Sequence, residues 1–150
     1  MKVQLRIGET EYALGAIADS LGFLTRVIQV QINDRLRATG LLNISPATLS
    51  LLRLLQANPG IRQSHAARIL MIQESNMANA IKDLIGRGLI ERRGDGRARS
   101  GLWITGQGER EVANCSAVDA LDRSYAAVLS DAEHRQLLRL LNRVYRAALS

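Results

Sequence analysis

Residues 74–105 decide the fold, and they read ESNMANAIKDLIGRGLIERRGDGRARSGLWIT. The first part, residues 74–86, has the pattern of a helix, and Gly88 marks the change to a different pattern. Residues 89–93 and 102–105 have the pattern of two short strands. The segment between them is rich in Gly and Arg, which is typical of a turn. We therefore predict a helix followed by a β-hairpin whose turn is longer than a two-residue turn.

Two further helices are predicted just before this stretch. Ser45 and Pro46 form the start signal of the first one, because a serine N-cap is often followed by proline at the first helical position. Residues 58–60 (NPG) end it, and the next helix covers about residues 63–70. Three helices followed by a two-stranded hairpin form a winged helix-turn-helix, whose third helix fits the major groove of DNA. The predicted winged core covers about residues 45–105.

The N-terminal end of the chain changes pattern once. Apolar residues alternate with polar ones over residues 3–7, which predicts a short strand or an extended arm. A long amphipathic helix is predicted over about residues 11–37, because an apolar residue recurs every three or four positions at Leu14, Ile17, Leu21, Leu24, Ile28, Ile32 and Leu36.

The C-terminal end, residues 106–150, is also predicted to be helical. The helical pattern returns after Gly108 and continues to about residue 128. Ser130 and Glu133 have the spacing of a capping box, so the last helix begins there, and one of its faces carries Leu137, Leu141, Val144 and Ala148. Two long helices with apolar faces are rarely buried by one short chain. We therefore expect a single mostly α (α+β) domain over residues 1–150 that forms a homodimer through its terminal helices.

The charge indicates the class of partner. The 150 residues carry 20 basic and 14 acidic side chains, and 18 of the basic ones are Arg, whose planar guanidinium suits phosphates and guanine edges. Residues 60–105 hold eight basic and four acidic side chains, so most of the net charge of +6 lies on the predicted winged core. Aromatic residues make up only 3%, which disfavours stacking on single-stranded bases. Double-stranded DNA is the favoured partner.

Other classes of protein find little support in the sequence. Motifs for zinc hydrolases, nucleophile elbows, P-loops and dinucleotide binding do not occur, and His65, His134 and Cys115 are too few for a structural zinc site. We therefore expect no enzyme activity, no cofactor and no metal. The sequence has neither an apolar run of about 18 residues nor the pattern of a secretory signal, so we expect a cytoplasmic protein with no internal disulfide.

Several short motifs resemble the MarR family of bacterial and archaeal transcriptional regulators. Residues 84–92 (LIGRGLIER) are similar to the family's step into the wing, L-x-x-x-G-L-[IV]-x-R. Residues 95–97 (DGR) resemble the D-x-R of the wing, and residues 104–108 (ITGQG) resemble the L-T-x-x-G that follows it. The order and spacing of the motifs are the specific signal. The resemblance covers most of residues 11–150 and extends to NPGI at 58–61, QSHAARIL at 63–70, QESNMANAI at 73–81 and LSDAE at 129–133.

The resemblance implies a homodimer that binds DNA through paired winged domains and a small-molecule effector that weakens this binding. In the family the effector pocket lies between the terminal helices and the winged domain, but this sequence identifies neither its lining nor its ligand. The chain departs from the family pattern in three places. Arg62 replaces the usual Ser or Thr helix cap, Arg97 lies slightly further from Thr105 than is usual, and residues 1–7 are an additional arm.

The candidate DNA contacts lie on the third helix and the wing. Asn76, Asn79 and Lys82 are groove candidates, because Asn can form two hydrogen bonds with an adenine edge and Lys can reach a phosphate. The alternative is that they form only the solvated face of an amphipathic helix. Arg97 and Arg99, at the tip of the wing, are candidates to enter a narrow minor groove. The alternative is that they only form a solvated loop. Further candidates for phosphate contacts are Ser64, Ser75, which is also a possible helix cap, and Arg92. One of Arg92 and its neighbour Arg93 is expected to pair with Glu91 or Asp95 instead.

The function predicted from these residues is a sequence-specific regulator of transcription, most simply a repressor, on a pseudo-palindromic site. Two alternatives stay open. One is a redox-sensing regulator that acts through Cys115, although an inert and partly buried thiol is the simpler reading of that residue. The other is a winged-helix module that binds protein instead of DNA.

Overall fold

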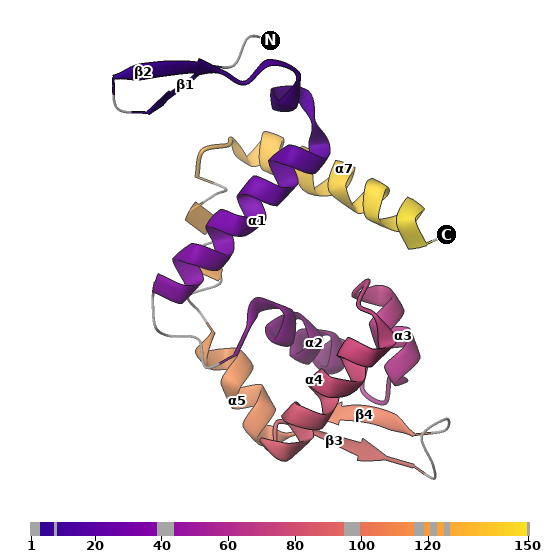
Figure 1. Ribbon diagram of the computed structural model, residues 1–150. Coiled ribbons are helices and arrows are strands. Elements are labelled where there is room, and N and C mark those ends of the chain that lie inside the picture. The colour runs from indigo at the N-terminus through magenta and orange to yellow at the C-terminus, as the bar shows by residue number, and fades with distance from the viewer. Residues whose placement is uncertain are drawn as a thin grey trace. The chain divides into compact units, whose positions relative to one another are not determined.

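The computed structural model describes residues 4–7, 9–38, 44–94, 100–115, 119–120, 123–124 and 127–149 (Figure 1). The chain divides into two compact units, Met1–Gly40 and Leu41–Ser150. Helices dominate the described residues, and two small antiparallel sheets accompany them. The predicted mostly α (α+β) class is therefore confirmed.

The first unit begins with a β-hairpin. Strand β1 (Gln4–Ile7) pairs with β2 (Thr10–Ala13), and the register places Gln4 opposite Ala13. The predicted strand near the N-terminus is thus confirmed, but its partner strand was not predicted. A short 3-10 helix, η1 (Gly15–Asp19), and then helix α1 (Leu21–Ala38) follow.

The prediction of one helix over residues 11–37 is wrong for residues 11–20. Gly15 has φ +56°, a left-handed conformation that an α-helix does not contain. The backbone of Ser20 is extended, and its hydroxyl accepts a hydrogen bond from the Phe23 N–H at 3.3 Å. This contact supplies a partner for one of the free N–H groups of the first turn, so the α-helix begins at Leu21.

The second unit contains the predicted winged helix-turn-helix. Its elements are α2 (Pro46–Ala57), α3 (Gln63–Ile69), α4 (Glu74–Gly86), β3 (Ile90–Arg93), β4 (Gly101–Ile104) and α5 (Gly106–Asn114). Strands β3 and β4 are antiparallel, with Ile90 opposite Ile104, and α4 contacts α3 and β3 (Figure 1). Ser45 caps α2 by accepting a hydrogen bond from the Thr48 N–H at 3.1 Å, as the start signal predicts.

The winged elements share one apolar core. Leu52, Leu55 and Met77 are 0% exposed, and the other fully or nearly fully buried apolar residues are Ile44, Leu49, Leu51, Ala66, Ala67, Ile81, Leu84, Leu89, Ile90, Leu102 and Cys115. The base of the wing is closely packed: a Cβ atom at Gly60, where φ is +82°, would lie 2.8 Å from the Trp103 ring. The wing is therefore anchored to the core at its base.

The segment after the wing differs from the prediction at both ends. Helix α5 begins at Gly106, before the predicted start, because the Thr105 hydroxyl caps it by accepting the Gly108 N–H at 3.1 Å. It does not continue to residue 128. Cys115 is the C-cap and its side chain lies in the core, while residues 119–120 and 123–124 are helical again.

The last helix, α7 (Asp131–Leu149), starts at the predicted capping box. The Ser130 N–H donates to the Glu133 carboxylate at 2.8 Å, and the Glu133 N–H donates back to the Ser130 hydroxyl at 3.4 Å. The hydrogen bond that the Ser130 hydroxyl donates to this carboxylate is the main cause that lowers the pKa of Glu133, and the bond from the Ser130 N–H lowers it further. None of the described helices is both long and apolar enough to cross a membrane.

Candidate nucleic-acid interface

Helix α4 has one buried face and one exposed face. Met77, Ile81 and Leu84 recur at intervals of four and three residues and point into the core. Asn76, Asn79 and Lys82 recur every three residues and are exposed. No hydrogen bond or ion pair joins any of these three polar side chains to the residues that the structure describes. Their donor and acceptor groups are therefore available to an external partner.

An open groove of about 380 Å³ runs beside this polar face. Its lining comes from three elements: Gln63 at the start of α3, residues along α4, and Arg92 on β3. It brings together three of the predicted site residues, namely Asn79, Lys82 and Arg92. The sequence did not single out the remaining lining residues, which are Gln63, Ala78, Ile81 and Ile85.

Arg92 has a structural partner on each side of its guanidinium. One terminal nitrogen donates to the Gln63 Oε1 at 2.8 Å and the other donates to the Ser100 hydroxyl at 3.1 Å. These bonds connect β3 with the residue just before β4 and with the start of α3. Arg92 therefore pairs with neutral side chains and not with an acidic neighbour. The bond to Gln63 spans 29 positions, so no local spacing in the sequence signals it.

Its neighbour Arg93 does pair with an acidic residue, as the sequence suggested for one of the two arginines. The Arg93 guanidinium contacts the Glu91 carboxylate and lies 5.3 Å from the centre of the Trp103 ring. The Arg93 charge is thus already in contact with an anion and an aromatic face on the wing.

The serine candidates lie in the first turns of their helices. Ser64 is the second residue of α3 and Ser75 is the second residue of α4, and both are exposed. The suggestion that Ser75 caps α4 is wrong, because Gln73 occupies the N-cap and its side chain makes no capping bond. Arg62 occupies the N-cap of α3 without a side-chain bond, as its replacement of Ser or Thr predicts.

Two of the predicted contacts, Arg97 and Arg99, lie outside the described residues. The described ends of the wing are Gly94, which has φ +113°, and Ser100, which is 2% exposed. Arg97 and Arg99 therefore stay predictions from the sequence.

Cys115 is poorly placed for redox chemistry. It is more deeply buried than the sequence suggested, at 3% exposure. Burial is the main cause that raises the pKa of its thiol, and the charge of Glu111 raises it further. A raised pKa leaves little reactive thiolate at neutral pH. Among the described residues, no group of three or more His, Cys, Asp and Glu side chains is placed to hold a metal ion.

Comparison with known proteins indicates the family of this chain. The chain is 31% identical over 141 residues to the "putative transcriptional regulatory protein for hcr operon" of Thauera aromatica, and the match covers 91% of this chain and 85% of the relative. The model of the MarR family matches residues 42–99, which contain α2, α3, α4 and β3.

Solved structures agree with this assignment. The repressor CouR bound to a 23-mer DNA duplex has a TM-score of 0.78 and 26% identity, over 90% of this chain and 99% of CouR. CouR bound to p-coumaroyl-CoA has a TM-score of 0.74 and 26% identity, over 89% and 96%. One similar fold thus occurs with DNA and with a small molecule. The protein therefore belongs to the MarR family of winged helix-turn-helix transcriptional regulators.

Proposed function

We propose that this regulator is a homodimeric repressor that inserts α4 into the major groove of a specific DNA site. The observation that carries the proposal is the division of α4, whose apolar side chains are buried while Asn76, Asn79 and Lys82 are exposed without a partner among the described residues. Asn76 and Asn79 would read base edges, and Lys82 would contact a backbone phosphate.

The neighbouring elements would hold this helix in place on the duplex. Ser64 and Ser75, exposed in the first turns of α3 and α4, would donate to phosphates. Arg92 would use the guanidinium N–H groups that are not bonded to Gln63 and Ser100 for the same purpose, because Arg has five such donors. Arg97 and Arg99 would enter the minor groove from the wing tip.

The proposed dimer would cover apolar side chains that the subunit leaves exposed. In α1 these include Leu24 and Ile28, and in α7 they include Leu137, Leu141 and Val144. Such rows on long helices are typical of subunit contacts. Residues 1–150 would then act as one cytoplasmic MarR-like domain. A two-fold dimer would require a pseudo-palindromic site with half-sites about one helical turn, or 10–10.5 bp, apart.

We propose an anionic small molecule as the effector. CouR binds p-coumaroyl-CoA, a thioester with several phosphates, at 26% identity to this chain. Here Arg135, Arg139 and Arg143 are exposed at every fourth position of α7, whereas its acidic residues, Asp131 and Glu133, are confined to the first turn. An effector that binds a dimer with misplaced recognition helices more tightly would release DNA by shifting the population.

The decisive experiment is selection of bound sequences from a random duplex library at two salt concentrations. We expect an inverted repeat whose affinity falls steeply with salt, because phosphate contacts release counterions. Recovery of no common sequence would contradict the proposal and favour the protein-binding module. Addition of p-coumaroyl-CoA, free CoA or p-coumarate to the complex would then test the effector. Release by none of the three would contradict a CouR-like effector.

A further inference from the structure

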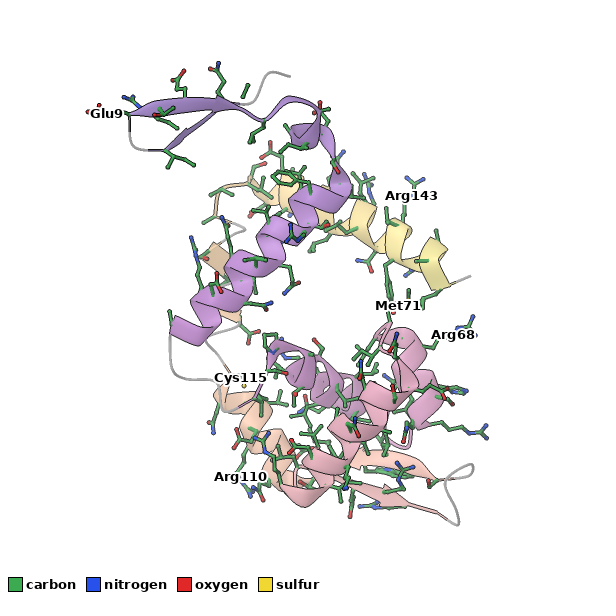
Figure 2. All side chains as sticks on the ribbon, in the orientation of Figure 1. Glu9, Arg68, Met71, Arg110, Cys115 and Arg143 are labelled. Atoms are coloured by element: carbon green, nitrogen blue, oxygen red, sulfur yellow. The ribbon has the colours of Figure 1, made fainter. Side chains whose placement is uncertain are left out.

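Two hydrogen bonds, one donated by each helix, join the C-terminal end of α3 to the C-terminal part of α7. Figure 2 labels Arg68, which donates one of them, and Met71 just after the end of α3. The Tyr145 hydroxyl of α7 donates to the backbone carbonyl of Ile69, the last residue of α3, at 2.8 Å. The Arg68 guanidinium of α3 donates to the carbonyl of Leu149, the last residue of α7, at 2.9 Å. We call this pair of bonds the α3–α7 contact.

The bond from Tyr145 satisfies an acceptor that the backbone leaves open. The last carbonyls of a helix lack partners within the helix. At the end of α3, the three backbone N–H groups of residues 70–72 donate to the carbonyls of Ala66, Ala67 and Arg68. No described backbone N–H group donates to the Ile69 carbonyl, so the Tyr145 hydroxyl caps α3 from another element.

Arg68 acts on both helix ends at once. Each C-terminus carries a partial negative charge from the helix dipole, and two such ends repel when they approach. Arg68 lies in the last turn of α3 and bonds the last carbonyl of α7, so its positive charge is close to both ends. Its cation is therefore placed to stabilise the partial negative charge at both helix ends.

The contact lies just before the recognition helix. Ile69 is followed by Leu70 and then Met71, which has φ +53°, a left-handed conformation that is uncommon for a residue other than glycine. Helix α4 begins at Glu74. A displacement of α7 that pulls on the Ile69 carbonyl would therefore be passed to the start of α4 through a short and conformationally restricted turn.

We propose that Tyr145 and Arg68 are positioning residues, which fix the recognition helix relative to α7 and thereby set the half-site spacing that the dimer accepts. This inference rests on the proposed dimer, in which α7 belongs to the subunit contact. The two α4 helices of such a dimer would be held apart by α7 and the α3–α7 contact of each subunit. Loss of the contact would let each α4 change position, at a cost in preorganisation.

The test is Tyr145→Phe, which removes one hydroxyl and no charge. Its affinity would be measured on the selected site and on duplexes with the half-sites moved 1 or 2 bp closer or further apart. We expect binding to the optimal site to weaken about 2- to 10-fold, as for loss of one neutral hydrogen bond, and the preference for that spacing to flatten. Base preferences within each half-site and the dimer should stay unchanged, which a general loss of structure would not allow.

Matched variants make the test specific. Gln136→Ala removes an exposed polar side chain from the same helix and should keep the wild-type spacing profile. Arg68→Lys keeps a cation at the contact and should retain more of the spacing preference than Arg68→Met. Unchanged spacing dependence in Tyr145→Phe, or tighter binding at the same spacing, would overturn the inference.

A second measurement does not depend on DNA. Hydrogen exchange at the amides of residues 70–73 should be faster in Tyr145→Phe than in the wild type, because the Ile69 carbonyl loses its partner. Unchanged exchange would overturn the inference even if the wild type bound its site as proposed. If the wild type bound no duplex, the proposed function would fail, while the exchange result would still decide whether the α3–α7 contact orders the turn.

Discussion

The helices of the winged core and helix α7 are amphipathic, but they differ in burial. The core helices bury their apolar faces within the subunit, whereas α7 leaves its apolar face exposed. Leu52, Leu55 and Met77 of the core are completely buried by residues of the same chain. Helix α7 has no buried residue, and its Leu137 and Val144 are 43% and 54% exposed. An apolar stripe therefore predicts that a helix face will be covered, but it does not say whether the cover comes from the same chain.

The largest effect should follow a cavity in the core. Leu52→Ala should lower the free energy of unfolding by about 2–5 kcal/mol, since Leu52 is 0% exposed and its loss removes buried contacts and leaves a void. Urea unfolding at fixed protein concentration measures it. Ile85→Ala, at an exposed position of α4, is the control and should cost less than about 1 kcal/mol. Equal losses of unfolding free energy in the two variants would contradict the difference in burial between Leu52 and Ile85.

The same kind of change on α7 should affect association instead. Leu141→Glu should weaken dimerisation by at least about 30-fold, or about 2 kcal/mol, because an unpaired charge would enter the proposed apolar contact. Sedimentation equilibrium measures the dissociation constant. Gln136→Glu, which adds the same charge on a different face of α7, should leave it nearly unchanged. A Leu141→Glu protein that dimerises like the wild type would show that α7 is covered in some other way.

A smaller and more selective effect is expected on the exposed face of α4. Asn79→Ala should reduce discrimination at one base pair by about 1–3 kcal/mol, because the amide can no longer bond a base edge. Lys82→Ala should weaken binding to all sequences alike and reduce the slope of log affinity against log salt by about 1. Fluorescence anisotropy with matched and mismatched duplexes separates the two. Uniform weakening by Asn79→Ala would indicate a phosphate contact instead of base recognition.

The parts of the fold that the sequence predicted correctly have strong local signals. The Ser45 cap with Pro46 marks the start of α2, and the Ser130–Glu133 capping box marks the start of α7. The N-terminal error has a physical cause, since Leu14 and Ile17 continue the spacing of a helix although Gly15 adopts a left-handed conformation. A hydrophobic period does not report such a break.

The candidate site was predictable only in part. The division of α4 follows from its period of 3.6, so Asn76, Asn79 and Lys82 could be expected on its outer face. The bonds of Arg92 with Gln63 and of Tyr145 with Ile69 join positions 29 and 76 residues apart. They depend on tertiary packing, which no local spacing encodes.

The smallest effect is expected at Cys115, which tests where the self-contained core ends. Its thiol belongs to the core cluster although it lies past the last residue of α5. In the native protein it should react slowly with a thiol reagent at pH 8 and quickly in urea, and peroxide should not release DNA.

Because burial raises the pKa of the Cys115 thiol, the unfolded chain loses the thiol proton first. The free energy of unfolding should therefore fall as the pH rises above about 8.5, the pKa of a free thiol. Cys115→Ala should remove this decline and change DNA affinity little. Rapid labelling of the native thiol, together with peroxide release that Cys115→Ala abolishes, would instead place Cys115 outside the core and support redox sensing, because a thiolate must be accessible to react.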